Sequence, residues 1–211
     1  MAFRWELRAA ERGHVDAQFN TGVFYEHGEG VEVDHAAAVT WFRKAAERGD
    51  RAAQLTLGAA FEHGKGTPQN YVLAATWYQR AADRGHTSAM ANLGGLYSAG
   101  HGVEQDHARA NALYREAVEA DNNTTALFNL GLSHLKGTGV EESSVPTALS
   151  FWQRAADLGH AGAQGNIGEA YRDGAGGYPK NDELARQYMK ASAAQGDRRA
   201  IAHLTKMNAC V

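Results

Sequence analysis

Cysteine is nearly absent from this chain, which has a single copy, Cys210, in 211 residues. A lone cysteine cannot form an internal disulfide, and such usage is typical of a reducing compartment. The segment that begins at Met1 does not have the form of a signal peptide. We therefore expect a cytoplasmic protein, or a periplasmic or secreted one if the chain is a fragment that lacks its signal peptide.

Long apolar runs and an excess of positive charge are missing as well. No stretch approaches the roughly 18 consecutive apolar residues that indicate a membrane-spanning helix, although 44% of the residues are hydrophobic. The chain has 21 Lys and Arg against 24 Asp and Glu, a formal net charge of −3. Proteins that bind nucleic acid normally carry a basic patch or stripe. The sequence therefore predicts no membrane span and no nucleic-acid partner.

The chain instead contains one pattern that recurs about every 36 residues. In each copy an alanine precedes a central glycine, and an aromatic residue (histidine in one copy) and a Gly-x-Gly pair follow it. The central glycines are Gly22, Gly58, Gly94, Gly131 and Gly168. A fixed period in this range indicates stacked supersecondary units, which bury their apolar surface between neighbouring repeats.

Each repeat contains two segments with helical periodicity. Ala38, Trp41, Phe42 and Ala45 fall on one helical stripe, and the segment around Gly58 shows the same spacing. The Gly-x-Gly pair ends the first helix because glycine readily adopts the left-handed conformation. Before each second helix stands a residue whose side-chain oxygen can cap free backbone N–H groups. These predicted caps are Asp34, Asn70, Asp106, Ser144 and Asn181.

Short connections between these helices favour antiparallel neighbours. We predict an all-α fold, a right-handed superhelix (solenoid) of about eleven helices that forms a single domain over residues 1–211. A partial repeat at 1–13 contributes one helix, and a capping helix lies within 197–211. The full repeats are expected at 14–49, 50–85, 86–122, 123–159 and 160–196.

The third full repeat matches a known motif almost letter for letter. It contains Ala89, Leu93-Gly94, Tyr97, Gly100-His-Gly102-Val103 and Asp106. This series resembles the Sel-one-like repeat family, a relative of the tetratricopeptide repeat, and the resemblance covers nearly the whole chain. It implies an adaptor, mostly bacterial, that binds other proteins. The chain departs from the cysteine-rich secreted branch of that family, in which disulfides tie each helix pair.

A binding face can be placed on the first helices, which line the concave wall in stacks of the tetratricopeptide type. Residues at the wall positions vary between repeats, whereas the packing positions do not. The wall changes from acidic to apolar and basic along the chain, so a partner protein or peptide could lay an apolar segment on it. The alternative is that these positions are merely solvated helix faces. The candidate partner-binding residues are Phe19, Glu26, His27, Leu55, Glu62, His63, Phe128, Leu132, Leu135, Lys136 and Arg172.

Two patterns suggest chemistry of another kind. Glu26-His27 and Glu62-His63 occupy matching places in adjacent repeats and could converge on a metal, which would need three or four such ligands. We favour the simpler interpretation, the polar end of a first helix, and expect no metal and no cofactor.

Ser133 and Lys136 match the Ser-x-x-Lys motif of penicillin-recognising enzymes. No Lys-Thr-Gly or Ser-x-Asn segment accompanies them, and Ser133 falls at an inward position. We therefore expect a small core residue, whose replacement by alanine leaves folding almost intact, and no catalytic residues.

Three functions follow from these observations. The favoured one is a scaffold or adaptor, expected to be a monomer, that holds a partner protein or peptide. A sequestering inhibitor such as an immunity protein is a special case that the sequence does not separate from it. A β-lactam-binding or β-lactamase-like enzyme, an activity credited to part of the family, is the third.

Two further expectations concern packing. Trp41 and Trp77 lie on the inward stripe of the second helices. Both are predicted to be core residues that contribute equally to the stability of the fold. The fourth full repeat has His134 at the aromatic position, a longer preceding turn and a longer internal loop. Loss of the ring contact and the longer loops together predict weak coupling to both neighbours and a hinge at this repeat.

Overall fold

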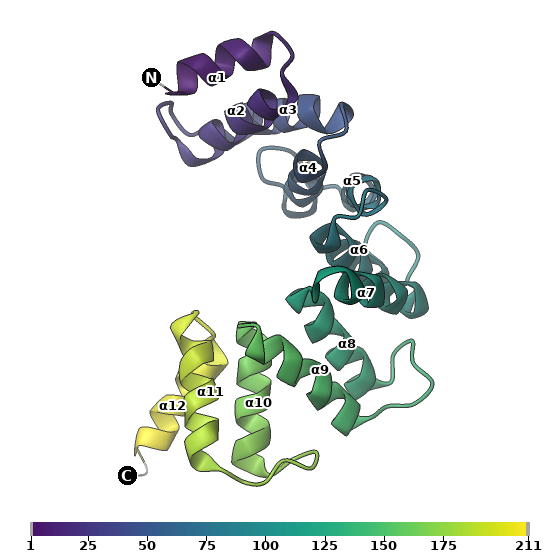
Figure 1. The fold of residues 1–211 in the computed structure, drawn as a ribbon, viewed down its shortest axis with the longest axis vertical. Coiled ribbons are helices and arrows are strands. Elements are labelled where there is room, and N and C mark those ends of the chain that lie inside the picture. The colour runs from purple at the N-terminus through teal and green to yellow at the C-terminus, as the bar shows by residue number, and fades with distance from the viewer. Residues whose placement is uncertain (1, 210–211) are drawn as a thin grey trace. The chain divides into compact units, whose positions relative to one another are not determined.

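The computed structural model describes residues 2–209, with side chains described up to residue 206, and these residues form twelve α-helices (Figure 1). They are divided between two compact units, Met1–Asp106 and His107–Val211. The helices of the N-terminal unit are α1 (Ala2–Glu11), α2 (Val15–His27), α3 (His35–Glu47), α4 (Arg51–His63), α5 (Tyr71–Ala82) and α6 (Thr87–Ala99). Those of the C-terminal unit are α7 (His107–Asp121), α8 (Thr124–Lys136), α9 (Val145–Asp157), α10 (Ala161–Asp173), α11 (Asp182–Ala194) and α12 (Arg198–Ala209).

Within each unit every helix packs against the helix that precedes it and the helix that follows it. The predicted all-helical repeat fold is confirmed, with one helix more than the expected count of about eleven. The prediction of one continuous domain stays a prediction. None of the described helices is long and apolar enough to cross a membrane. Cys210 lies outside the described residues.

Helix starts follow the predicted capping chemistry. The Asp34 side chain accepts hydrogen bonds from the backbone N–H groups of Ala36 and Ala37, both at 2.9 Å. Asn70, Ser144 and Asn181 cap α5, α9 and α11 in the same way. These contacts satisfy backbone donors that have no partner inside the helix. Four of the five predicted caps are thus confirmed, and Asp106 directly precedes α7.

The central glycines mark places where two helices of one repeat cross at close range. A Cβ atom on Gly22 would lie 2.5 Å from Phe42 Cε1, and one on Gly58 would lie 2.6 Å from Tyr78 Cδ1. A side chain at these positions would overlap the ring of the second helix. Phe42 and Tyr78 are accordingly among the most buried side chains, at 2% and 0% exposure. The repeated glycine therefore sets the distance between paired helices.

The fourth full repeat keeps a ring contact at its aromatic position. The imidazole of His134 stacks on Phe151, with ring centroids 5.5 Å apart and an interplanar angle of 20°. Burial, followed by the charge of Arg115, lowers the pKa of His134, which favours the neutral ring. The expectation of a lost ring contact was wrong because imidazole is flat and stacks much as a phenyl ring does.

Ser133 belongs to a buried polar network in the C-terminal unit. Its hydroxyl donates to Asn111 Oδ1 at 2.7 Å, and Asn111 Nδ2 donates to the backbone oxygens of Thr138 and Gly139. Ser133 and Asn111 are both buried, as the inward position of Ser133 predicted. The network ties the loop after α8 to α7, so Ser133 is more than a small space-filler.

Replacement of Ser133 by alanine should lower the free energy of unfolding by about 1–3 kcal/mol, because Asn111 Oδ1 then loses its donor inside the core. This corrects the expectation that folding would be almost unaffected. Urea denaturation of the full chain measures the change, with Ser150→Ala on the exposed face of α9 as the control. Equal stability of the Ser133→Ala variant and the parent would contradict a structural role for the hydrogen bond.

Candidate functional site

The predicted partner-binding residues all lie on first helices of repeats, and none of them is buried. Helices α2 and α4 of the N-terminal unit carry Phe19, Glu26, His27, Leu55, Glu62 and His63. Helices α8 and α10 of the C-terminal unit carry Phe128, Leu132, Leu135, Lys136 and Arg172. They therefore form two groups, and their role in binding stays a prediction.

In the C-terminal group several side chains already have partners within the unit. Phe128 stacks on His160 with centroids 4.6 Å apart, so its ring is only partly accessible. The Arg172 guanidinium makes two hydrogen bonds of 2.7 Å to Asp173. Leu135 is 41% exposed and is the most open apolar residue of this group. The structure shows no pocket lined by these five residues among those described for this unit.

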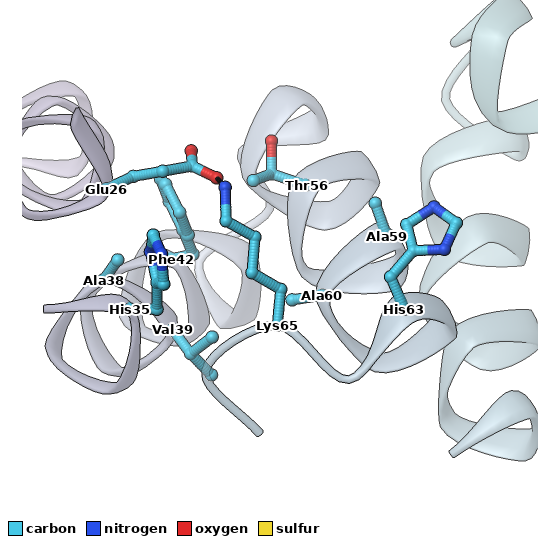
Figure 2. A pocket seen from close by; sticks show the side chains of 10 residues that line it. All are labelled: Glu26, His35, Ala38, Val39, Phe42, Thr56, Ala59, Ala60, His63 and Lys65. Atoms are coloured by element: carbon cyan, nitrogen blue, oxygen red, sulfur yellow. Dashed lines mark hydrogen bonds and ion pairs between the residues drawn. The ribbon is translucent and has the colours of Figure 1, made fainter. Parts of the chain in front are cut away.

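Two residues of the N-terminal group, Glu26 and His63, border a pocket between α3 and α4 with a volume of about 220 Å³ (Figure 2). Helix α3 contributes Ala38, Val39 and Phe42, and α4 contributes Thr56, Ala59 and Ala60. Glu26, His35, His63 and Lys65 supply the polar part of the lining. An apolar floor with a few polar groups at its edge is the usual composition of a ligand site.

An ion pair spans the mouth of this pocket. Lys65 Nζ donates to Glu26 Oε1 at 2.6 Å, and the two side chains are 50% and 22% exposed. Figure 2 shows the Lys65 stem extending from the loop after α4 toward the Glu26 carboxylate. Gly64 ends α4 in the left-handed conformation, and the N–H of Lys65 donates to the backbone oxygen of Ala60. The helix end therefore directs Lys65 back over the pocket.

His35 brings a polar atom into the lining that has no hydrogen-bond partner. Its Nδ1 is shielded from solvent and makes no hydrogen bond. Such a buried group carries a desolvation cost that no hydrogen bond within the described residues recovers. The repeat pattern places His35 directly after the predicted cap Asp34, at the start of a second helix. Nothing in that pattern indicates that His35 borders a pocket.

The matching place one repeat later is filled. Tyr78 replaces Phe42, and its hydroxyl donates to Glu62 Oε2 at 2.6 Å. Leu96 replaces Ala60 and is 2% exposed. Burial, and then the hydrogen bond to Glu62, raises the pKa of Tyr78, so its hydroxyl stays protonated as a donor. Glu62 is therefore engaged within the chain and offers less to a partner than Glu26 does.

The structure does not bring the two Glu-His pairs together. Glu26 lies at the pocket mouth, whereas Figure 2 shows His63 apart from it at the end of α4. His27 Nδ1 lies 3.1 Å from the backbone oxygen of Val23. Within residues 2–209, no three His, Cys, Asp or Glu residues are grouped so that they could hold a metal ion.

The sequence prediction missed Lys65, His35 and the α3 side of the pocket. Lys65 lies between the two glycines of a Gly-x-Gly pair, which the pattern marks only as a helix end. Ala38 and Phe42 had been assigned to packing alone. A comparison of aligned repeats does give a signal, because Ala60 and Phe42 are smaller or less polar than their counterparts Leu96 and Tyr78.

Comparisons with known proteins agree with this architecture. A solved Sel1 repeat protein from Oxalobacter formigenes is 34% identical with a TM-score of 0.85, covering 90% of this chain and 75% of that one. A protective antigen of uropathogenic Escherichia coli strains with an SLR fold is 30% identical with a TM-score of 0.51. That match covers 98% of this chain but only 51% of the antigen.

An immunity protein of Pseudomonas aeruginosa, Pa5087, is 22% identical with a TM-score of 0.61, over 91% of this chain and 72% of that one. This likeness shows the fold alone. None of the curated proteins matches the sequence significantly.

The sequence model of the Sel1 repeat matches six segments, which together span most of the chain. The matched segments are 1–14, 15–50, 51–86, 87–122, 124–160 and 161–197. Their limits differ from the repeats predicted by the glycine pattern by no more than one residue. The chain belongs to the Sel1 repeat family.

Proposed function

We propose that this protein is an interaction scaffold that holds a partner protein or peptide, and that the pocket between α3 and α4 receives an anchoring side chain of that partner. The observation that supports this most directly is the contrast between adjacent repeats. The pocket lined by Phe42 and Ala60 is open, whereas the matching place at Tyr78 and Leu96 is filled from within.

The size and chemistry of the pocket suit one side chain. Engineered apolar cavities of about 150 Å³ hold a benzene molecule, and this pocket has about 220 Å³. Binding energy at protein interfaces is concentrated in a few anchors that enter well-packed pockets. The half-buried residues Phe19 and Leu55 on α2 and α4 provide apolar surface for the rest of the partner.

Filling the pocket with the residue that the next repeat uses should weaken partner binding. We expect Ala60→Leu to weaken binding by at least about tenfold, the effect of losing one anchor. The free energy of unfolding should stay the same or rise by about 1 kcal/mol, since a cavity is filled. The full chain, immobilised, is used to capture partners from the native host, and the affinity of each captured protein is then measured.

Ala112→Leu on the exposed face of α7 is the matched control, because it adds the same side chain to the other unit. A partner that is retained by the parent and by Ala112→Leu but lost by Ala60→Leu supports the proposal. If every captured partner binds the Ala60→Leu variant as tightly as the parent, the pocket is not the binding site.

A sequestering inhibitor is one form of such a scaffold, and a protein of similar fold from Pseudomonas aeruginosa is named an immunity protein. An enzyme partner whose activity is blocked in the complex would identify that form. For β-lactam chemistry the buried Ser133 offers little, because its hydroxyl donates to Asn111 inside the core. A chromogenic β-lactam assay on the purified chain tests that alternative.

A further inference from the structure

The repeat that follows the pocket shows what this fold places in the same position. Counting about 36 residues onward, Glu26 corresponds to Glu62, Phe42 to Tyr78, and Ala60 to Leu96. In that repeat a phenol hydroxyl donates to the carboxylate at 2.6 Å, and the leucine side chain is buried. The chain thus contains a complete internal example of a phenol bound to the matching glutamate.

The pocket lacks the parts that would complete that arrangement. Phe42 has the ring but no hydroxyl, so nothing on α3 donates to Glu26 as Tyr78 donates to Glu62. Ala60 leaves open the volume that Leu96 occupies. One polar group remains for a ligand: the Glu26 carboxylate, whose partner among the described residues is the half-exposed Lys65.

We infer that the pocket binds the side chain of a tyrosine on the partner, with the phenol hydroxyl donating to Glu26. This inference rests on the proposed scaffold function and specifies the anchor. A phenol hydroxyl is a hydrogen-bond donor, so it can give Glu26 the bond that Tyr78 gives Glu62. The apolar ring meets Val39, Phe42 and Ala60, and tyrosine has this combination of an apolar body and a polar tip.

Other side chains fit less well. Phenylalanine or leucine would leave Glu26 without a new partner while removing water from it. An ammonium group has no acceptor capacity, and Lys65 already supplies one to Glu26. A phosphorylated tyrosine would bring negative charge against the Glu26 carboxylate. The Lys65–Glu26 pair is half exposed on the lysine side, and such pairs contribute little to stability, so a tyrosine can displace it readily.

The test uses single amino-acid amides as probes and the full chain, isotopically labelled, in NMR titrations. N-acetyl-tyrosinamide should shift signals of pocket residues and bind at least about tenfold more tightly than N-acetyl-phenylalaninamide, as expected for a hydrogen bond to a charged group. N-acetyl-lysinamide should bind more weakly than the tyrosine probe. Equal affinity of the tyrosine and phenylalanine probes, shifts outside the pocket, or no binding of the tyrosine probe would each overturn the inference.

Phe42→Tyr provides the decisive variant, because it supplies the missing hydroxyl from within the chain. Its preference for the tyrosine probe over the phenylalanine probe should fall to about twofold or less, since Glu26 then has its own donor as Glu62 does. Glu47→Gln, on the exposed part of α3, is the control and should keep the full preference. An unchanged preference in Phe42→Tyr contradicts the role of Glu26.

The two proposals fail in different ways. If Ala60→Leu loses the partner but the probes show no preference for tyrosine, the scaffold function stands and the anchor is another side chain. If the probes prefer tyrosine but partners bind Ala60→Leu normally, the pocket recognises phenols and the partner binds elsewhere.

Discussion

Replacement of Gly66 by alanine is expected to lower the free energy of unfolding of the N-terminal unit by about 2–5 kcal/mol. Gly66 has φ +74°, a left-handed conformation that costs an alanine about 1–2 kcal/mol. A Cβ atom at this position would also overlap the backbone oxygen of His35. Backbone cannot move aside as a flexible side chain can, so the loop itself must shift, at a further cost of about 1–3 kcal/mol.

Gly85→Ala is the matched control for this experiment, which urea denaturation of both variants would measure. Gly85 has φ +80°, but a Cβ there would meet nothing within 4 Å. The control therefore carries only the conformational cost, about 1–2 kcal/mol. If both variants lose the same stability, the close approach of Gly66 to His35 contributes nothing.

Trp77→Ala should lower the free energy of unfolding by about 3–5 kcal/mol, the usual cost of removing a large buried aromatic side chain. Trp77 is 7% exposed, and the Arg80 guanidinium lies 4.5 Å from its ring centroid. For Trp41→Ala we expect a smaller loss, about 2 kcal/mol, because that ring is only partly buried and Lys44 covers it from the solvent side. Thermal and urea denaturation of the two variants measure the difference.

This pair of variants tests burial at equivalent positions of neighbouring repeats. The sequence pattern assigns the two tryptophans the same role, but the structure separates them. Similar losses from both variants would mean that the exposure of Trp41 does not reduce its contribution. A parent-like melt of Trp77→Ala would show that the assigned core of α5 is wrong.

The sequence predicted the helices and their ends well because these depend on local chemistry. Asp34, Asn70, Ser144 and Asn181 cap helices through contacts within three residues of each cap. The glycine at the end of each first helix acts locally too, through its left-handed backbone. A periodic sequence repeats these signals, so each repeat supports the interpretation of the others.

The candidate site was predicted only in part because it depends on contacts between repeats. Glu26 was placed on the binding face, but its partner Lys65 lies one repeat onward. The Ser133 hydroxyl likewise finds Asn111, a residue of the preceding helix whose polarity breaks the apolar pattern. The sequence period does not predict such pairs, because it shows only the residues that the repeats share. The pairs lie at positions where the residue in one repeat differs from the residue in the next.

The pocket between α3 and α4 bears on the number of ligand sites that one chain of this kind can carry. In an array of similar repeats, a ligand site exists wherever smaller residues replace the side chains that fill this place in another repeat. The number of sites therefore depends on a few side chains and not on the fold. Tyr78→Phe together with Leu96→Ala would reproduce at α5 and α6 the residues that leave the first pocket open. A chain with two such sites would hold a partner that carries two anchors far more tightly than either site alone, because the second contact becomes intramolecular.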